Sequence, residues 1–369
     1  MKIYFNEVSI KPKVYKQNIL KSVSSLLDKG RFLNGQENQK LINNLRRFLG
    51  KGSVVLTASG HDALLYALQA LHLSSRDEVI FPVNAYPTAF PIAQSGVKPV
   101  PVDVDQNGLI DPKQIVKKIT KNTKAIVIVH LYGLVADVDG IKQLIKNKKI
   151  ILIEDCAQAF GSTYKGKPVG TFGDISCFSF YPTKNLATLG DGGALWTKNK
   201  KFCKYFQQAI SYGEKRRYQS EFIAGHSRLP EIQAGILNVY LRTINKDLQK
   251  RKRVFSYYQN LFATYKLNDR MKIIYDKQNS KPALHMLVIE TQDRDGLKNY
   301  LRRNGLETLV HYPLPIHLLP AFSHLKFKRG DFPTAERLAN NVLSLPFHSY
   351  LTKKQVEFIV KSIRNFYYG

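Results

Sequence analysis

The chain has 369 residues, of which 44% are hydrophobic and 11% aromatic, so it is long enough for two domains with sizeable cores. Its formal net charge of +28 is extreme, but the basic residues are spread along the chain and accompany no zinc-finger, helix-turn-helix or RNA-recognition signature. Three cysteines without metal-ligand spacing, no signal-peptide pattern and no apolar run of membrane-spanning length favour a cytoplasmic protein. We therefore expect a globular protein whose diffuse basic surface helps to attract an anionic substrate.

The first fifty residues read as an arm and two helices, over residues 14–27 and 39–49, each ended by a glycine. From residue 53, short apolar strands alternate with segments of helical pattern, beginning with the strand SVVLT and a helix over 61–73. This alternation predicts a mostly parallel sheet covered by helices.

The pattern of predicted helices and strands changes near residue 250. Residues 232–253 read as one long helix, and shorter segments follow, among them the strand HMLVIET and a helix over 294–303. We expect an arm and large domain over residues 1–249 and a smaller α+β domain over residues 250–369.

Polar residues follow the predicted strands. Ligands of parallel sheets bind beyond the carboxyl ends of the strands, so residues at these ends are expected to share one site. The residues at such ends are Gly60, Tyr86, Asp155, Ser179 and Lys184.

A lysine and an acid just beyond buried strands are what a pyridoxal phosphate site requires, because the lysine forms a Schiff base and the acid holds the pyridinium nitrogen protonated. Lys184 and Asp155 meet this requirement. The turn Ser59-Gly60-His61 precedes a helix, and free backbone N–H groups at such a turn suit a phosphate. Ser59 and Asp62 also form a capping-box pattern, so an ordinary capped helix explains this turn equally well.

Two stretches imitate ligand-binding loops. DVDQNGLIDPKQ begins like a calcium loop but carries Gln114 where the bidentate Glu belongs, and GSTYKGKP has Pro168 where a phosphate loop needs Ser or Thr. We interpret the first as a polar turn and the second as a hairpin turning at Lys165-Gly166, and we expect no metal site.

With these parts in place, the chain resembles the DegT/DnrJ/EryC1/StrS family of sugar aminotransferases from about Gly30 to Ile363. The matching stretches are GRFLNG, TASGHDALLYAL, DEVIFPVNAYPTA, GVKPVPVDVD, IVHLYG, IEDCAQAFGS, GDISCFSFYPTKNL, GDGGAL, HSRLPEIQAGIL and HYPLPIHLLPAF. The resemblance implies fold type I of the pyridoxal phosphate enzymes, with a mostly parallel seven-stranded sheet flanked by helices and a smaller α+β domain.

The resemblance also implies roles for single residues. Lys184 would carry the cofactor and act as acid and base, and Asp155 would pair with the pyridine nitrogen. Gln158 would hydrogen-bond the ring hydroxyl, and Tyr86 would stack on the ring, although core packing explains Tyr86 almost as well. The cofactor phosphate would be held by Gly60, His61 and Ser179.

Two departures from the family pattern involve histidines. His61 stands where the family has Thr or Ser, and His226 stands in AGHSR where the family motif has an Asn that reaches the phosphate of the neighbouring subunit. An imidazole N–H can also donate to phosphate, so the role of His226 would persist in the expected homodimer. The resemblance places His311, Tyr312 and His317 near the substrate, but a proline-stiffened structural loop is nearly as good a reading of HYPLPIH.

These inferences predict a pyridoxal-phosphate-dependent aminotransferase that converts a keto-sugar, most simply a nucleotide-linked one, with glutamate as amino donor. One alternative is a sugar 3-dehydratase, whose relatives carry His at the position of Lys184. Others are an aminotransferase of a free keto-cyclitol and, from a different class, a basic nucleic-acid-binding regulator that has kept the fold.

Overall fold

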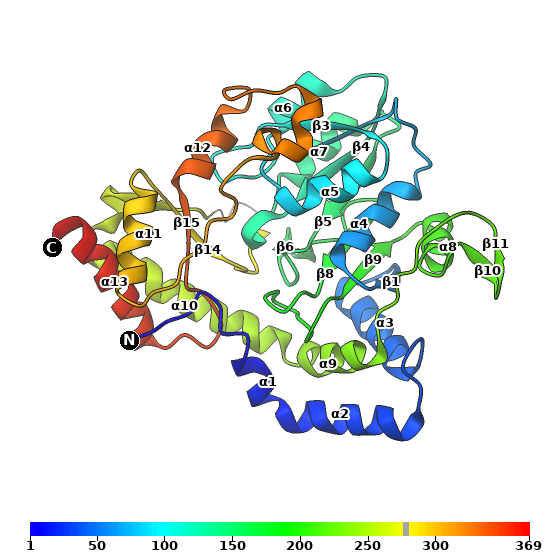
Figure 1. The fold of residues 1–369 in the computed structure, drawn as a ribbon, viewed down its shortest axis with the longest axis horizontal. Helices are drawn as coiled ribbons and strands as arrows, with labels where there is room; N and C mark the ends of the chain where they lie inside the picture. The colour runs from blue at the N-terminus through cyan, green and yellow to red at the C-terminus, as the bar shows by residue number, and fades with distance from the viewer. Residues whose placement is uncertain (276–279) are drawn as a thin grey trace.

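The computed structural model describes residues 1–275 and 280–369. Its centre is a seven-stranded sheet, predicted from the βα alternation and the family resemblance and now confirmed (Figure 1). The strands lie in the order β1 (Ser53–Thr57), β9 (Gly193–Thr197), β8 (Ile175–Ser179), β5 (Ile151–Asp155), β4 (Thr123–Val129), β2 (Glu78–Pro82) and β3 (Lys98–Val102). Neighbouring strands run parallel except at β9, which is antiparallel to both β1 and β8.

Apolar side chains alternate between the two faces of the strands, so both faces need cover. Val55, Phe81 and Val127 face a core formed with helices α4 (Gly60–Gln69), α5 (Tyr86–Gln94) and α8 (Lys200–Ala209). Their neighbours in the strands face a second core. That core is covered by α2 (Lys16–Lys29), α3 (Gln36–Leu49), α6 (Pro112–Lys118), α7 (Val138–Ile145) and α9 (Glu231–Leu241).

The single long helix predicted over residues 232–253 is wrong. The chain forms α9 and then α10 (Ile244–Thr264), with a turn at Arg242 and Thr243 between them. The apolar residues of α9 belong to the core of the large sheet, whereas Val254, Phe255 and Tyr258 of α10 belong to a separate core. A change of direction between the helices lets one apolar stretch serve two cores.

That separate core belongs to the small C-terminal part of the chain. An antiparallel sheet of β12 (Met271–Ile273), β14 (Leu287–Thr291) and β15 (Val342–Leu345) packs with α10, α11 (Arg294–Arg303) and α13 (Lys353–Tyr368). Helix α12 (Pro333–Asn341) leads into β15. The predicted boundary between residues 249 and 250 falls inside α10, and Ile3 of the N-terminal arm joins the small core, so the division into two domains stays a prediction.

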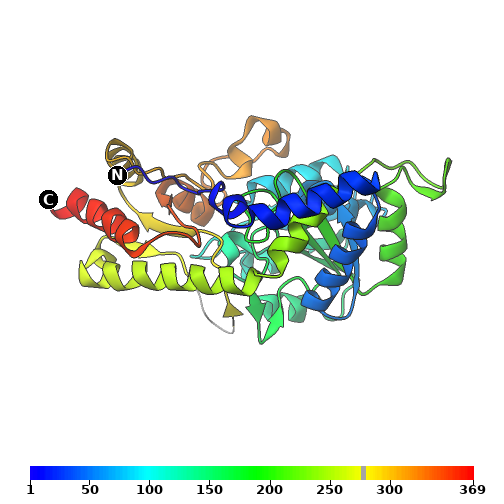
Figure 2. The same cartoon turned by 90° about the horizontal axis from the view of Figure 1, so that it is seen from below.

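The remaining elements are short. The arm continues into α1 (Ile10–Val14), and β6 (Thr163–Tyr164) and β7 (Lys167–Pro168) form the predicted hairpin at Lys165-Gly166, with β13 (Ser280–Lys281) paired to β6. A second hairpin, β10 (Glu214–Arg216) and β11 (Gln219–Ser220), projects beyond the seven-stranded sheet and its helices (Figures 1 and 2). The 3₁₀ turns are η1 (Leu131–Gly133), η2 (Leu267–Asp269), η3 (Ile316–Leu318) and η4 (Pro320–Leu325). Among the described residues, the helices all fall short of the length and apolar character that crossing a membrane demands.

Candidate active site

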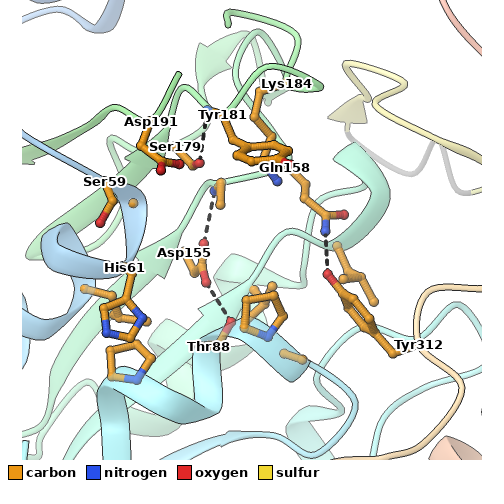
Figure 3. Close-up of a pocket in the computed structure, with 18 residues that line it drawn as sticks. Ser59, His61, Thr88, Asp155, Gln158, Ser179, Tyr181, Lys184, Asp191 and Tyr312 are labelled. Atoms are coloured by element: carbon orange, nitrogen blue, oxygen red, sulfur yellow. Dashed lines mark hydrogen bonds between the residues drawn. The ribbon is translucent and has the colours of Figure 1, made fainter. Parts of the chain in front are cut away.

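A cavity of about 340 Å³ opens at the carboxyl ends of the parallel strands (Figure 3). It is built from the turns after β1, β2, β4, β5 and β8, as expected for a parallel sheet. The sequence-predicted residues that line it are Gly60, His61, Asp155, Gln158, Ser179, Lys184 and Tyr312. Segments that are more than 250 residues apart in the chain therefore meet at one site.

Lys184 reaches this cavity from the loop after β8, where its backbone N–H donates to the carbonyl of Tyr181 at 2.8 Å. Burial lowers the pKa of the Lys184 amine from 10.5 to about 8, and the nearby Asp155 carboxylate opposes part of that shift. Near neutral pH, an amine with such a pKa is deprotonated in a much larger fraction of molecules than an ordinary lysine amine is. Lys184 is thus suited to act as a nucleophile and as a proton carrier.

Asp155 ends β5, and both of its carboxylate oxygens are fixed. The Thr88 hydroxyl donates to Oδ2 at 2.7 Å, and the backbone N–H of Ala157 donates to Oδ1 at 3.0 Å. The side chain is buried, yet each oxygen keeps a lone pair for a further donor. A buried carboxylate held in this way is suited to a cationic N–H in the cavity.

The turn after β1 forms a cradle at the start of α4. Ser59 Oγ accepts from the backbone N–H of Asp62 at 3.0 Å, but the Asp62 carboxylate accepts from Ser227 Oγ at 2.7 Å, so only half of the predicted capping box forms. Within the described residues, the backbone N–H groups of Gly60 and His61 have no acceptor. Free N–H groups at a helix N-terminus suit a phosphate.

Glycine is required at this turn because Ser179 lies directly against it. A Cβ on Gly60 would come within 2.6 Å of the Ser179 Cβ. The close approach places the Ser179 hydroxyl beside the cradle, where both residues line the cavity.

Gln158 is oriented by the turn after β4. The backbone N–H of Tyr132 donates to Gln158 Oε1 at 2.7 Å, which leaves Nε2 to donate to the Tyr312 hydroxyl at 3.3 Å. Tyr132 adopts a left-handed backbone conformation with φ of +61°, which is uncommon for a residue other than glycine. The amide therefore presents N–H groups to the cavity side.

Four other predicted residues do not line the cavity. Tyr86 lies beside it, with its ring 5.7 Å from that of Tyr312, and His311 is close enough to Lys184 that burial and the lysine charge lower its pKa to about 4. His317 is buried and bonds to Glu336 at 3.0 Å, so the structure does not bring it to this cavity. His226 is exposed beyond the projecting hairpin and accepts from Arg228 Nε at 2.9 Å.

Sequence reasoning missed three residues that shape the site. Thr88 holds Asp155, Tyr132 orients Gln158, and Tyr181 lines the cavity next to Lys184. Thr88 and Tyr181 lie within a few residues of strand ends, which is a signal that could have selected them. Their partners could not be read from the chain, because Thr88 and Asp155 are 67 residues apart.

One buried group has ligand types that suit a metal: His130, Glu154 and Cys156, the single such group among the described residues. Glu154 already accepts from the backbone N–H groups of Gly170, Phe172 and Gly173 and from His130. The Nδ1 atom of His130 accepts from Ala136, and burial raises the pKa of the Cys156 thiol well above its usual value. Since a metal needs free lone pairs and a thiolate, this group fits a structural hydrogen-bond network instead.

The cavity residues fit pyridoxal phosphate. The group needs an amine for its carbonyl carbon, a carboxylate for its ring nitrogen and donors for its phosphate. Lys184, Asp155 and the turn that follows Ser59 supply these on separate walls of one cavity (Figure 3). That turn leaves no room for a Cβ at Gly60, because Ser179 lies against it.

Comparisons with known proteins identify the family of the chain. Residues 13–364 match the DegT/DnrJ/EryC1/StrS aminotransferase family. A pleiotropic regulatory protein of Geobacillus stearothermophilus is 34% identical over 95% of both chains. The dTDP-3-amino-3,4,6-trideoxy-alpha-D-glucose transaminase of Streptomyces venezuelae is 32% identical over 93% of this chain and 90% of its own.

Solved structures share the fold of the chain. DesV of S. venezuelae, crystallised with a ketimine intermediate, superposes with a TM-score of 0.95 at 31% identity, covering 99% of this chain and 98% of its own. The PLP form of a putative sugar aminotransferase from Streptococcus pneumoniae superposes with a TM-score of 0.89 at 25% identity, covering 99% of this chain and 98% of its own. The chain therefore belongs to the DegT/DnrJ/EryC1/StrS aminotransferase family, the pyridoxal-phosphate-dependent sugar aminotransferases.

Proposed function

We propose that this protein transfers an amino group from glutamate to the ketone of a nucleotide-linked sugar. The observation that carries the proposal is the buried Lys184 amine, with its pKa lowered to about 8, in the same cavity as the fixed carboxylate of Asp155. A curated relative acting on a dTDP-linked sugar supports the substrate class. The net charge of +28 suits a substrate that carries a diphosphate.

Pyridoxal phosphate, when bound, supplies a carbonyl carbon that accepts an amino group and a ring that draws electrons from the substrate. The chain's own residues then bind, orient and move protons. Lys184 holds the cofactor and carries the proton to and from the substrate carbon, and Asp155 keeps a proton on the ring nitrogen. Gln158 donates to the ring hydroxyl, while the backbone N–H groups of Gly60 and His61 bind the phosphate together with the Ser179 hydroxyl.

The aromatic residues at the mouth of the cavity complete the proposal. Tyr312 lines the cavity, and Tyr86 and His311 lie against its ring. From these positions Tyr86 would face the ring of the cofactor, and Tyr312 and His311 would contact the substrate. Tyr86, Phe90 and Tyr312 form a chain of ring contacts with centroids 5.0 and 5.7 Å apart, an apolar wall suited to a sugar face.

We also propose a homodimer in which the partner subunit contributes His226 to the phosphate site. The projecting hairpin and the residues after it support this, because Tyr218 in the hairpin turn is 81% exposed and Ile223, which follows β11, is fully exposed. Apolar side chains on a projecting segment are expected to be buried by association. Sedimentation of the purified protein tests this state, and a monomer that binds the cofactor at full strength would contradict the role of His226.

The central experiment tests Lys184. The purified protein with pyridoxal phosphate should absorb visible light, and borohydride should fix the cofactor on the peptide that contains Lys184. Lys184→Ala should abolish this adduct and lower turnover by at least about 10³-fold, since nucleophilic and proton-transfer roles are both lost. Lys201→Ala, which removes an exposed lysine on α8, is the matched control and should behave as wild type.

A screen of keto-sugar nucleotides with glutamate, following 2-oxoglutarate, identifies the substrate class. Turnover of a free keto-cyclitol alone would favour the antibiotic-type alternative, and loss of a sugar hydroxyl without amino transfer would favour a dehydratase. Salt-sensitive DNA binding without visible absorbance would favour a regulator.

A further inference from the structure

The N-terminal strap, which we define as residues 1–11, is bonded to the small domain along its first half. The N–H of Ile3 donates to the Gly305 carbonyl at 2.9 Å, and the Ile3 carbonyl accepts from Glu307 at 3.0 Å. The N–H of Phe5 then donates to the Glu307 carboxylate at 2.9 Å. The strap is thus fixed to the small domain by backbone hydrogen bonds, and the side chain of Ile3 packs in the core of that domain.

The second half of the strap reaches the loop that carries Lys184. Asn6 Nδ2 donates to the carbonyl of Thr183 at 3.4 Å, and Lys11 Nζ donates to the carbonyl of Asn185 at 3.4 Å. These two carbonyls flank Lys184 directly. The strap therefore contacts the residue before and the residue after the lysine, on the side away from the cofactor cavity.

A second, small cavity of about 40 Å³ lies behind this loop and is lined by residues of the strap, the loop and α10. Its lining includes Asn6, Lys11, Lys184 and Asp247. Lys184 lines both this cavity and the active-site cavity, so its loop lies between the two. The bonds from the strap add to the loop's own bonds, from the Lys184 N–H to the Tyr181 carbonyl and from Asn185 Nδ2 to the Ala283 carbonyl.

Lys11 is firmly anchored. Its amine lies 2.8 Å from Asp247 Oδ2, with side-chain exposures of 15% and 4%, and 4.6 Å from the centre of the Tyr240 ring. Burial lowers the pKa of Lys11 while Asp247 opposes that shift. A desolvated pair with fixed geometry holds its members more rigidly than an exposed pair does.

We propose that Lys11 and Asn6 are positioning residues that hold the Lys184 loop from behind and couple its position to that of the small domain. The coupling follows from connectivity: the same eleven residues are bonded to the small domain at one end and to both neighbours of Lys184 at the other. The inference rests on the proposed function only in that it makes Lys184 the reacting group.

The test uses Lys11→Met in the full chain, with Lys13→Met as the matched control, because Lys13 is an exposed residue of the same short helix. Two properties are measured: the rate at which Lys184 captures pyridoxal phosphate, and the pH midpoint of Lys184 labelling by a small amine-reactive reagent mapped by mass spectrometry. Lys11→Met should slow capture at least about fivefold and move the midpoint upward from about 8, since a loosened loop exposes the amine. Lys13→Met should match wild type in both.

A role in stability alone predicts a different outcome. If Lys11→Met lowers the melting temperature but leaves capture rate and labelling midpoint at wild-type values, the proposal is wrong. Should that variant not fold, Asn6→Ala removes one bond at the other flank of Lys184 and should slow capture about twofold to fivefold, and an unchanged rate there overturns the proposal. If wild-type Lys184 captures no cofactor, the proposed function fails, while the labelling midpoint still tests the strap.

Discussion

Two buried carboxylates, those of Asp155 and Asp247, lie on opposite sides of the Lys184 loop and differ in their partners. Asp155, on the cavity side, accepts one neutral hydroxyl and one backbone N–H, and it keeps lone pairs for a ligand. Asp247, on the strap side, lies 2.8 Å from the Lys11 amine and raises the pKa of the buried Arg251 guanidinium against the lowering effect of burial. One acid is held ready for a cationic ligand, whereas the other is already neutralised by cations of the protein.

The comparison shows that burial alone does not identify a functional acid. Asp155 and Asp247 are 8% and 3% exposed, so neither exposure nor residue type separates them. Their hydrogen-bond and ion-pair partners separate them. Neutral donors hold the Asp155 carboxylate and leave its negative charge uncompensated, whereas a lysine and an arginine compensate the charge of Asp247. We therefore expect substitutions of Asp155 to act directly on chemistry. Substitutions of Asp247 should act first on stability, and on the Lys184 loop only through Lys11.

The largest expected effect is on folding. Asp247→Asn leaves the buried Lys11 and Arg251 without their anion, so the free energy of unfolding should fall by about 3–5 kcal/mol. The unfolding midpoint in urea measures this. Asp295→Asn, which breaks an exposed contact to Arg294, is the control and should cost at most about 1 kcal/mol. An equal loss in both variants would contradict the buried-pair interpretation.

The next effect is on chemistry. Asp155→Asn keeps the shape of the side chain and an oxygen that can accept from Thr88, but it removes the charge that faces the cavity. Turnover should fall by on the order of 10²-fold, the size typical of a lost electrostatic contact to a charge that develops in the reaction. Steady-state kinetics with glutamate and the keto-sugar measure it, while the urea midpoint should stay near the wild-type value.

The pH dependence of Lys184 gives a second measurement on the same variant. The Lys184 amine reacts only when deprotonated, so the rate of cofactor capture should rise with pH and level off above about 8 in wild type, far below 10.5. The Asp155 charge raises the pKa of Lys184, so its removal should move the midpoint to lower pH. A midpoint that moves upward, or stays near 10.5 in wild type, would show that the two groups do not interact in this way.

The architecture of the seven-stranded sheet could be predicted from the sequence because the patterns that indicate it are local. The alternation of apolar strands with helical segments predicts the parallel sheet, and the residues at strand ends predict where Asp155, Ser179 and Lys184 gather. The break between α9 and α10 could not be predicted, because the apolar pattern continues from one helix into the next. The two helices differ only in the core that they face.

The contacts that adjust the site depend on residues far apart in the chain. Thr88 and Asp155 are 67 residues apart, and Lys11 of α1 pairs with Asp247 of α10, although most of the chain lies between them in sequence. His317 shows the converse, because a motif beside predicted substrate contacts turns out to hold a buried hydrogen bond to Glu336. Pattern and resemblance select the reacting groups, while the hydrogen-bond partners of each group require the fold.

A smaller effect is expected from the group that fixes Asp155. Thr88→Val is nearly isosteric and removes the 2.7 Å hydroxyl bond to the carboxylate, so turnover should fall about tenfold, within the range for a hydrogen bond to a charged group. Thr171→Val removes a 2.7 Å hydroxyl bond to the Pro168 carbonyl, away from the cavity, and is the matched control. If Thr171→Val is also slower, or if Thr88→Val is fully active, the Thr88 hydroxyl does not support turnover by holding the Asp155 carboxylate.

The smallest effect is expected at His61, the residue that departs from the family pattern in the phosphate cradle. Its imidazole Nε2 lies 2.7 Å from Gln94 Oε1, so the ring is engaged by α5, while the backbone N–H at the start of α4 remains available to the phosphate. His61→Thr keeps that N–H and restores the family residue. Cofactor affinity should therefore change by no more than about threefold, which is below 1 kcal/mol.

Fluorescence titration with pyridoxal phosphate measures the affinity. Gly60→Ala, whose Cβ would meet Ser179 at 2.6 Å, is the comparison variant and gives the loss of affinity that a distorted phosphate cradle causes. A loss at His61→Thr as large as that at Gly60→Ala would mean that the imidazole itself binds the phosphate.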